Sequence, residues 1–153
     1  MKNQKQIIEG GNMQRGSALI AVCFTAGLIG ALFSNGALWL SVKSQLTTYA
    51  GVAISPDFGL PWLYPRLLFG GLWGLVYYLT VGARRTRRRW VRKGLWVSLL
   101  PTAVQLLILF PYCEGKDLLG LSLGSLTPAF IFAQYLIWGF FTGFFTRLFW
   151  GKE

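Results

Sequence analysis

The sequence lacks histidine altogether, and its 153 residues include only five acidic side chains and two cysteines. The absence of histidine removes the commonest general base and metal ligand. Asp57, Glu114 and Asp117 are expected in loops, so none supplies the embedded carboxylate that a proton relay in a membrane needs. Cys23 and Cys113 fall near opposite ends of apolar segments, which excludes a disulfide within one chain. We therefore expect no catalytic activity, no cofactor and no metal site.

The chain is rich in hydrophobic residues, which form long apolar segments. Hydrophobic residues make up 54% of it, charged residues only 13%, and the mean hydropathy is +0.48. This is more than a soluble core of this size can bury, so we predict an all-α integral membrane protein. The apolar segments are near the roughly 20 residues that cross about 30 Å of hydrocarbon. A single domain, 1–153, is expected to contain four transmembrane helices arranged as two helical hairpins. The predicted spans are 17–40, 65–81, 95–112 and 127–149, with outer loops 41–64 and 113–126 and a cytoplasmic loop 82–94.

The first span has two interpretations, which differ at Ser34, Asn35 and Gly36. In one, the span continues through these residues. In the other, it ends near Phe33 and Asn35 caps a separate helix that reaches about Thr48, which would place an amphipathic helix in the first outer loop. The span has no small-residue cleavage site after a short apolar core, so we expect a retained anchor.

A basic cluster in the cytoplasmic loop indicates how the chain is threaded. Its seven members are Arg84, Arg85, Arg87, Arg88, Arg89, Arg92 and Lys93. If both termini share the side of this loop, that side holds twelve of the fifteen basic residues, which predicts that both termini are cytoplasmic. The cluster is also expected to attract anionic lipid headgroups at about 1 kcal/mol per charge, and an acidic cytoplasmic protein is the alternative partner. Nucleic acid is not expected, because the cations lie in short loops instead of over a water-exposed face.

Glycines one helical turn apart recur in the second and fourth spans, at Gly70 with Gly74 and at Gly139 with Gly143. Such a pair exposes a flat strip of backbone on which another helix can pack closely in lipid. Both spans also start at a proline and contain Trp-Gly in their interior. This repeated pattern favours central positions for these two helices. Packing within one chain is favoured over a homodimer seam, and a homo-oligomer is the alternative.

Three polar residues are the candidate functional residues. Gln105 and Gln134 each lie about seven residues from the outer end of their span, roughly 10 Å deep at 1.5 Å per residue. Their equal depth predicts a hydrogen bond between them, either as interhelical glue or as the polar wall of a solute path. Arg66, at the outer mouth of the second span, is expected to pair with an acid of the outer loops; the alternative is an outward contact with an anion or headgroup. Pro101, one turn before Gln105, predicts a kink.

Three segments resemble a group of small bacterial inner-membrane proteins that have no established activity. They are PRLLFGGLWG at 65–74, PTAVQLLILFP at 101–111 and LGLSLGSLTPAF at 119–130, and the similarity covers about 65–143. The resemblance implies a bacterial inner-membrane location and the same four-span layout. It carries no functional residues over to this chain.

The sequence is compatible with two classes of function. A non-enzymatic scaffold or accessory subunit of a membrane assembly is favoured, because the helices are rich in packing glycines and poor in embedded charge. A small oligomeric channel or transporter is the alternative, and it needs a wet path lined by residues such as Gln105, Gln134, Thr25 and Asn35. An outer cavity that reaches both glutamines would favour the second class.

Overall fold

The computed structural model describes residues 2–54, 56–82 and 89–150, with side chains described from Arg15 onward. The described residues are almost entirely helical and include no β-strand. The α-helices are α1 (Lys2–Lys43), α2 (Leu46–Tyr49), α3 (Leu60–Val81), α4 (Trp90–Val97), α5 (Leu99–Val104) and α6 (Thr127–Trp150), with a π-helix η2 (Gln105–Cys113) and a 3-10 segment η3 (Leu118–Leu123) between α5 and α6.

Three helical stretches within the described residues are long and apolar enough to cross a membrane: Arg15–Lys43, Trp90–Cys113 and Thr127–Trp150. They coincide with the first, third and fourth predicted spans. Helix α3 covers the second predicted span with 22 residues, but its arginine, prolines, tryptophans and tyrosines make it less apolar than the other three. The prediction of an all-helical protein with membrane-spanning helices is therefore confirmed at this coarser level.

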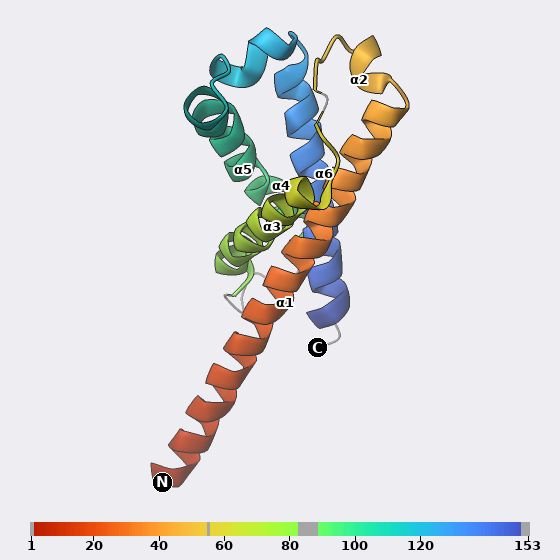
Figure 1. Ribbon diagram of the computed structural model, residues 1–153. Helices are drawn as coiled ribbons and strands as arrows, with labels where there is room; N and C mark the ends of the chain where they lie inside the picture. Colours follow the sequence, from red (N-terminus) through yellow and green to blue (C-terminus); the bar gives the residue numbers. More distant parts are fainter. Residues whose placement is uncertain (1, 55, 83–88, 151–153) are drawn as a thin grey trace.

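Helices α1 and α6 form the centre of the bundle (Figure 1). Helix α1 crosses both α3 and α6, while α4 packs on a neighbouring face of α6, at Gly139 and Gly143. The prediction that the second and fourth spans are central is wrong for the second, because α3 packs mainly on α1 and lies at the side. The start of α1 and the end of α6 lie toward one end of the bundle, and α2 lies at the other (Figure 1).

Glycine strips make these crossings close. Gly70 and Gly74 of α3 lie against Gly27 of α1, where a Cβ on any of the three would collide with backbone or side-chain atoms of the facing helix. Gly139 and Gly143 of α6 lie in the same way against α4, at Gly94 and Trp90. Both glycine pairs are therefore occupied by helices of the same chain.

Helix α1 runs without interruption through Ser34, Asn35 and Gly36. The Asn35 side chain does not cap a new helix; its Nδ2 donates to the carbonyl of Ala31 one turn earlier, 2.8 Å away. Ser34 Oγ donates to the carbonyl of Gln134 in α6 at 2.9 Å, which fixes this part of α1 against its neighbour. The first interpretation of this span is correct. Between α1 and α3, the described residues contain only the four-residue α2 and no long amphipathic helix, and α3 begins at Leu60, within the predicted loop 41–64.

The third predicted span is a broken helix. It is interrupted at Ser98, between α4 and α5, as expected from Pro101, whose missing N–H leaves the Val97 carbonyl without its i+4 donor. From Gln105 the helix widens into η2, which also contains Pro111. The wide geometry continues past its end, where the N–H of Glu114 donates to the carbonyl of Leu109 at 2.9 Å. The π-helical turns bring Glu114 back beside Gln105.

Candidate functional site

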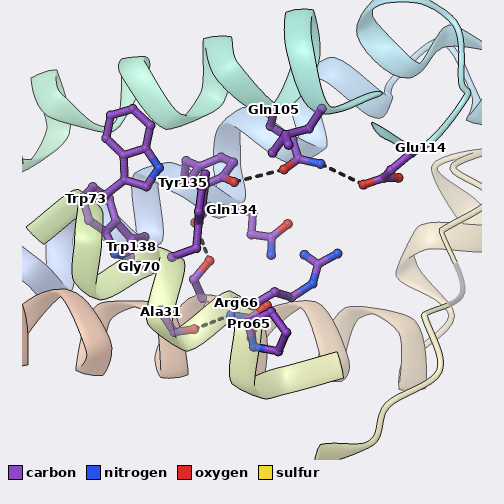
Figure 2. Close-up of a pocket in the computed structure, with 14 residues that line it drawn as sticks. Ala31, Pro65, Arg66, Gly70, Trp73, Gln105, Glu114, Gln134, Tyr135 and Trp138 are labelled. Atoms are coloured by element: carbon purple, nitrogen blue, oxygen red, sulfur yellow. Dashed lines mark hydrogen bonds between the residues drawn. The ribbon is translucent and has the colours of Figure 1, made fainter. Parts of the chain in front are cut away.

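A polar cavity of about 240 Å³ lies between α1, α3, η2 and α6 (Figure 2). It is partly open to the surroundings. The three candidate residues Arg66, Gln105 and Gln134 all line it. Other polar groups in its wall are Ser34, Asn35, Glu114 and Tyr135. The structure thus gathers polar side chains from four separate segments around one space.

Arg66 lies in the second turn of α3, where it is half-buried and lines this cavity. Its guanidinium stacks on the ring of Trp62, with 4.5 Å between Cζ and the ring centroid. Figure 2 shows the guanidinium pointing into the cavity, toward Gln134 and Glu114. Within the described part of the chain, no carboxylate oxygen lies within 4.0 Å of it. The predicted ion pair between Arg66 and an outer acid is therefore not formed.

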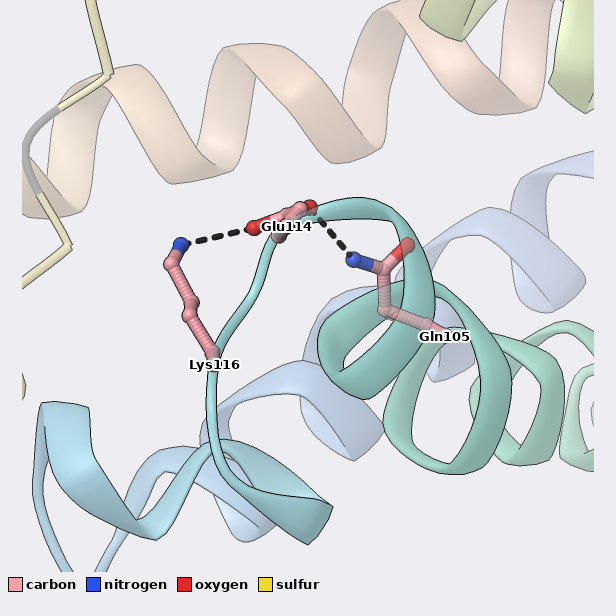
Figure 3. Close-up of polar contacts among 3 residues, drawn as sticks. All are labelled: Gln105, Glu114 and Lys116. Carbon is pink, nitrogen blue, oxygen red and sulfur yellow. Dashed lines mark hydrogen bonds and ion pairs between the residues drawn. The ribbon is translucent and has the colours of Figure 1, made fainter.

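Glu114 is held by other partners (Figure 3). Lys116 Nζ lies 2.6 Å from Glu114 Oε2, and Gln105 Nε2 donates to Glu114 Oε1 at 3.3 Å. Both carboxylate oxygens are thus engaged by donors outside α3.

Gln105 is the centre of a short hydrogen-bond chain. Besides donating to Glu114, its Oε1 accepts a hydrogen bond from the hydroxyl of Tyr135 at 3.3 Å (Figure 2). Gln105 is only 7% exposed. The predicted bond between Gln105 and Gln134 is not formed: Gln134 uses its backbone carbonyl to accept from Ser34, and its side chain lines the cavity separately. The two glutamines share a depth, but Tyr135 occupies the position between helices that Gln134 was expected to fill.

Asn35 lines the cavity wall, but its unsatisfied oxygen does not face the cavity. Its Nδ2 is committed to Ala31, while its Oδ1 has less than 1 Å² of accessible surface and no hydrogen-bond partner. The residue is only 6% exposed. A buried carbonyl oxygen without a donor costs about 1–3 kcal/mol, so this oxygen destabilises the position and is not a contact for a solute in the cavity. Thr25, also predicted to line a wet path, is instead on the exposed surface of α1.

The cavity ends on Trp138 at the side that faces the chain termini. Trp138 is 2% exposed, and its Nε1 donates to the carbonyl of Gly27 at 3.1 Å. Beyond it, a buried cluster that includes Cys23 and Tyr77 fills the interior. Within the part of the chain that the structure describes, the cavity is therefore a blind pocket in this conformation.

The basic cluster lies far from this cavity in the sequence and is only partly described. Arg84, Arg85, Arg87 and Arg88 lie outside the described residues. Arg89 and Arg92 are exposed, while Lys93 donates from Nζ to the carbonyl of Thr80 at 2.6 Å. The Lys93 ammonium therefore interacts favourably with the negative, C-terminal end of the α3 dipole. It is less available to lipid headgroups than its neighbours.

Sequence reasoning found four polar residues of the cavity, Asn35, Arg66, Gln105 and Gln134, and missed Glu114, Tyr135 and Trp138 as members of it. Glu114 was expected in a solvated loop, and Pro111 was the only sequence signal of the widened turn that returns it. Tyr135 and Trp138 look like ordinary aromatic packing residues in the sequence.

The chain matches no family model, no curated protein and no solved structure. The resemblance to small bacterial inner-membrane proteins therefore remains a prediction.

Proposed function

We propose that this chain is a four-span bacterial inner-membrane protein that binds a small polar solute in a cavity open toward the outer side, as a small channel or transporter does. The observation that supports this is the cavity that both Gln105 and Gln134 line. Polar and ionisable side chains in membrane helices are costly and often mark substrate or ion pathways, so this group of polar side chains around an accessible space supports a solute site.

The four-span threading rests on α3 as the fourth crossing. An even number of crossings agrees with the position of both chain ends toward one end of the bundle (Figure 1). Arg66 is the single charge within α3, and its location beside a polar cavity removes the main objection to embedding this helix. The exposed Arg89 and Arg92 would then lie at the cytoplasmic face, near anionic headgroups.

A scaffold or accessory subunit is the second candidate. The glycine crossings and the closed floor at Trp138 favour it, because a tightly packed bundle without a through-path needs no solute. A protein partner that remains bound at constant stoichiometry after purification in gentle detergent would favour this candidate.

The threading predicts a specific labelling pattern in intact cells. Native Cys113 is exposed and lies near the outer end of η2, so a membrane-impermeant thiol reagent should label it from outside. In a Cys113→Ser background, an Arg92→Cys variant should react only after the membrane is permeabilised. Buried Cys23 should react in neither condition. Labelling of Arg92→Cys in intact cells would overturn the proposed orientation.

Water access to the cavity is the test of the proposed function itself. In the Cys113→Ser background, Gln134→Cys should react with a small negatively charged methanethiosulfonate applied from outside, since this side chain lines the cavity. Ser98→Cys is the matched control, because Ser98 has 0% exposure at the break between α4 and α5. Equal, slow reaction at both positions would contradict an open cavity and favour the scaffold.

A further inference from the structure

We infer that the cavity binds a small oxyanion, with the Arg66 guanidinium of α3 as the charged contact and the Gln134 amide of α6 as a second hydrogen-bond donor. Carboxylates and phosphates have this chemistry, whether they belong to a soluble compound or to a lipid headgroup. The inference rests on the proposed function, because an anion reaches these two groups only through an open cavity.

Arg66 has hydrogen-bonding capacity that the protein does not use. Its guanidinium lies over the Trp62 ring, with 4.5 Å between Cζ and the ring centroid. The ring attracts the cation but does not accept its N–H groups as an oxygen does. Within the described residues, no carboxylate oxygen lies within 4.0 Å of the guanidinium nitrogens, and these nitrogens form no hydrogen bond. A guanidinium in this state is suited to bidentate binding of a carboxylate or phosphate.

Gln134 brings a neutral donor from α6 to the same space. Its backbone carbonyl accepts from Ser34, but its side-chain amide has no hydrogen-bond partner among the described residues. Figure 2 shows this amide and the Arg66 guanidinium in one cavity, and both residues also line the smaller cavity that adjoins it. Both are half-buried, and neither has a fully buried, unpartnered side-chain atom of the kind that Asn35 has. An anion in the cavity is therefore able to contact both.

The charges around the cavity favour an anion. Within the described residues, the charged side chains that line it and the adjoining smaller cavity are Arg66, Lys116 and Glu114. The Glu114 carboxylate is engaged by Lys116 Nζ and by Gln105 Nε2. The positive charge of Arg66 is thus left without a counter-ion. Because a charge removed from bulk water is costly until it is paired, an anion that enters is stabilised beside it.

The first experiment measures which charge the cavity attracts. In the Cys113→Ser, Gln134→Cys protein, each reaction rate with a methanethiosulfonate is divided by the rate of the same reagent with 2-mercaptoethanol, a neutral thiol. A negatively charged reagent should then react several-fold faster than a positively charged one of similar size, and adding Arg66→Gln should remove this preference. Adding Lys43→Gln should keep it, because Lys43 also lies over a tryptophan, with Nζ 4.9 Å from the Trp39 ring centroid, but does not line the cavity.

The second experiment measures binding by isothermal titration calorimetry, with the purified full chain in dodecyl maltoside, a detergent without phosphate or carboxylate. Acetate and inorganic phosphate are the probes, and acetamide is the neutral counterpart of acetate that should not bind. Arg66→Gln should weaken anion binding by at least about tenfold, since a charge-assisted bidentate contact is lost. Arg66→Lys keeps the charge without the planar fork, so its affinity should lie between the two. Lys43→Gln should leave the affinity unchanged.

Two further variants keep the test independent of folding defects. Glu114→Gln removes the carboxylate that lines the cavity, and it should tighten acetate binding several-fold because repulsion of the anion is lost. A gain in affinity cannot come from unfolding. Gln134→Leu removes a neutral donor, so it should weaken acetate binding less than Arg66→Gln does.

Adding phosphatidylglycerol to the micelles identifies the source of the anion. If a lipid headgroup is the ligand, this lipid will raise the Kd of acetate by competition, and if the ligand is soluble, the Kd will not change. Either result supports an oxyanion site at Arg66. Equal binding of acetate and acetamide, wild-type affinity in Arg66→Gln, or no binding of either anion overturns the inference.

The reactivity of Gln134→Cys separates this failure from failure of the proposed function. If the thiol reacts from outside with both charged reagents at equal normalised rates, the cavity is open and only its ligand class is wrong. If it reacts with neither, the proposed function fails as well.

Discussion

Replacing Gly139 by leucine is expected to lower the free energy of unfolding by about 3 kcal/mol, near the upper end of overpacking costs. A side chain at this position has nowhere to go, because even a Cβ would collide with the carbonyl of Gly94 and approach Ser98 Cβ to 3.0 Å. Both obstacles belong to the facing helical segment, so α4 and α6 must separate. Reversible unfolding in mixed detergent micelles, followed by circular dichroism, measures the loss.

The matched control is Gly36→Leu in α1. A Cβ on Gly36 meets nothing within 4 Å, because this glycine faces away from the bundle. The same substitution should therefore change the free energy of unfolding by no more than about 0.5 kcal/mol. Similar losses for the two variants would mean that detergent contacts, and not the crossing of α4 and α6, determine the effect, since the higher helix propensity of leucine would stabilise both variants.

Much of the helical layout was predictable from the sequence, because apolar segments of bilayer length leave few alternatives. The continuity of α1 was not. Ser34, Asn35 and Gly36 look like a helix end, but Ser34 bonds to α6 and Asn35 bonds within its own helix. Only tertiary contacts decide between a cap and a continuous helix there. The central helices were predicted wrongly in part for a similar reason. Glycines identify helices that approach a neighbour closely, but they do not identify which helix that neighbour is.

Several residues of the candidate site could be predicted from the sequence, but the contacts between them could not. Polar residues in apolar segments are easily found, so Arg66, Gln105 and Gln134 could be named in advance. Their partners depend on backbone irregularities. The π-helical turns of η2 return Glu114 to Gln105, and a non-helical stretch, described at 52–54 and 56–58, precedes α3 and its Arg66. Neither irregularity has a sequence pattern that fixes its geometry.

Replacing Trp138 by alanine is expected to have the largest effect of any single substitution in the cavity wall, a loss of about 3–5 kcal/mol in the free energy of unfolding. The indole is 2% exposed, forms the cavity floor and donates to the carbonyl of Gly27. Trp138→Phe keeps most of the volume but leaves that carbonyl without its donor, so it should cost less, about 1–3 kcal/mol. The same unfolding measurement compares the two variants.

Loss of the floor should also be visible in the chemistry of Cys23. This thiol has 0% exposure and lies one turn from Gly27, in the cluster beyond Trp138. With Cys113 replaced by serine, Cys23 should be unreactive toward a small thiol reagent in the native protein and in Trp138→Phe, but should react in Trp138→Ala, because water then extends from the cavity into the interior. If Cys23 stays protected in Trp138→Ala while stability falls as expected, the bundle has collapsed around the missing ring. The barrier to solute passage would then be the glycine crossing of α1 and α3, and not the indole.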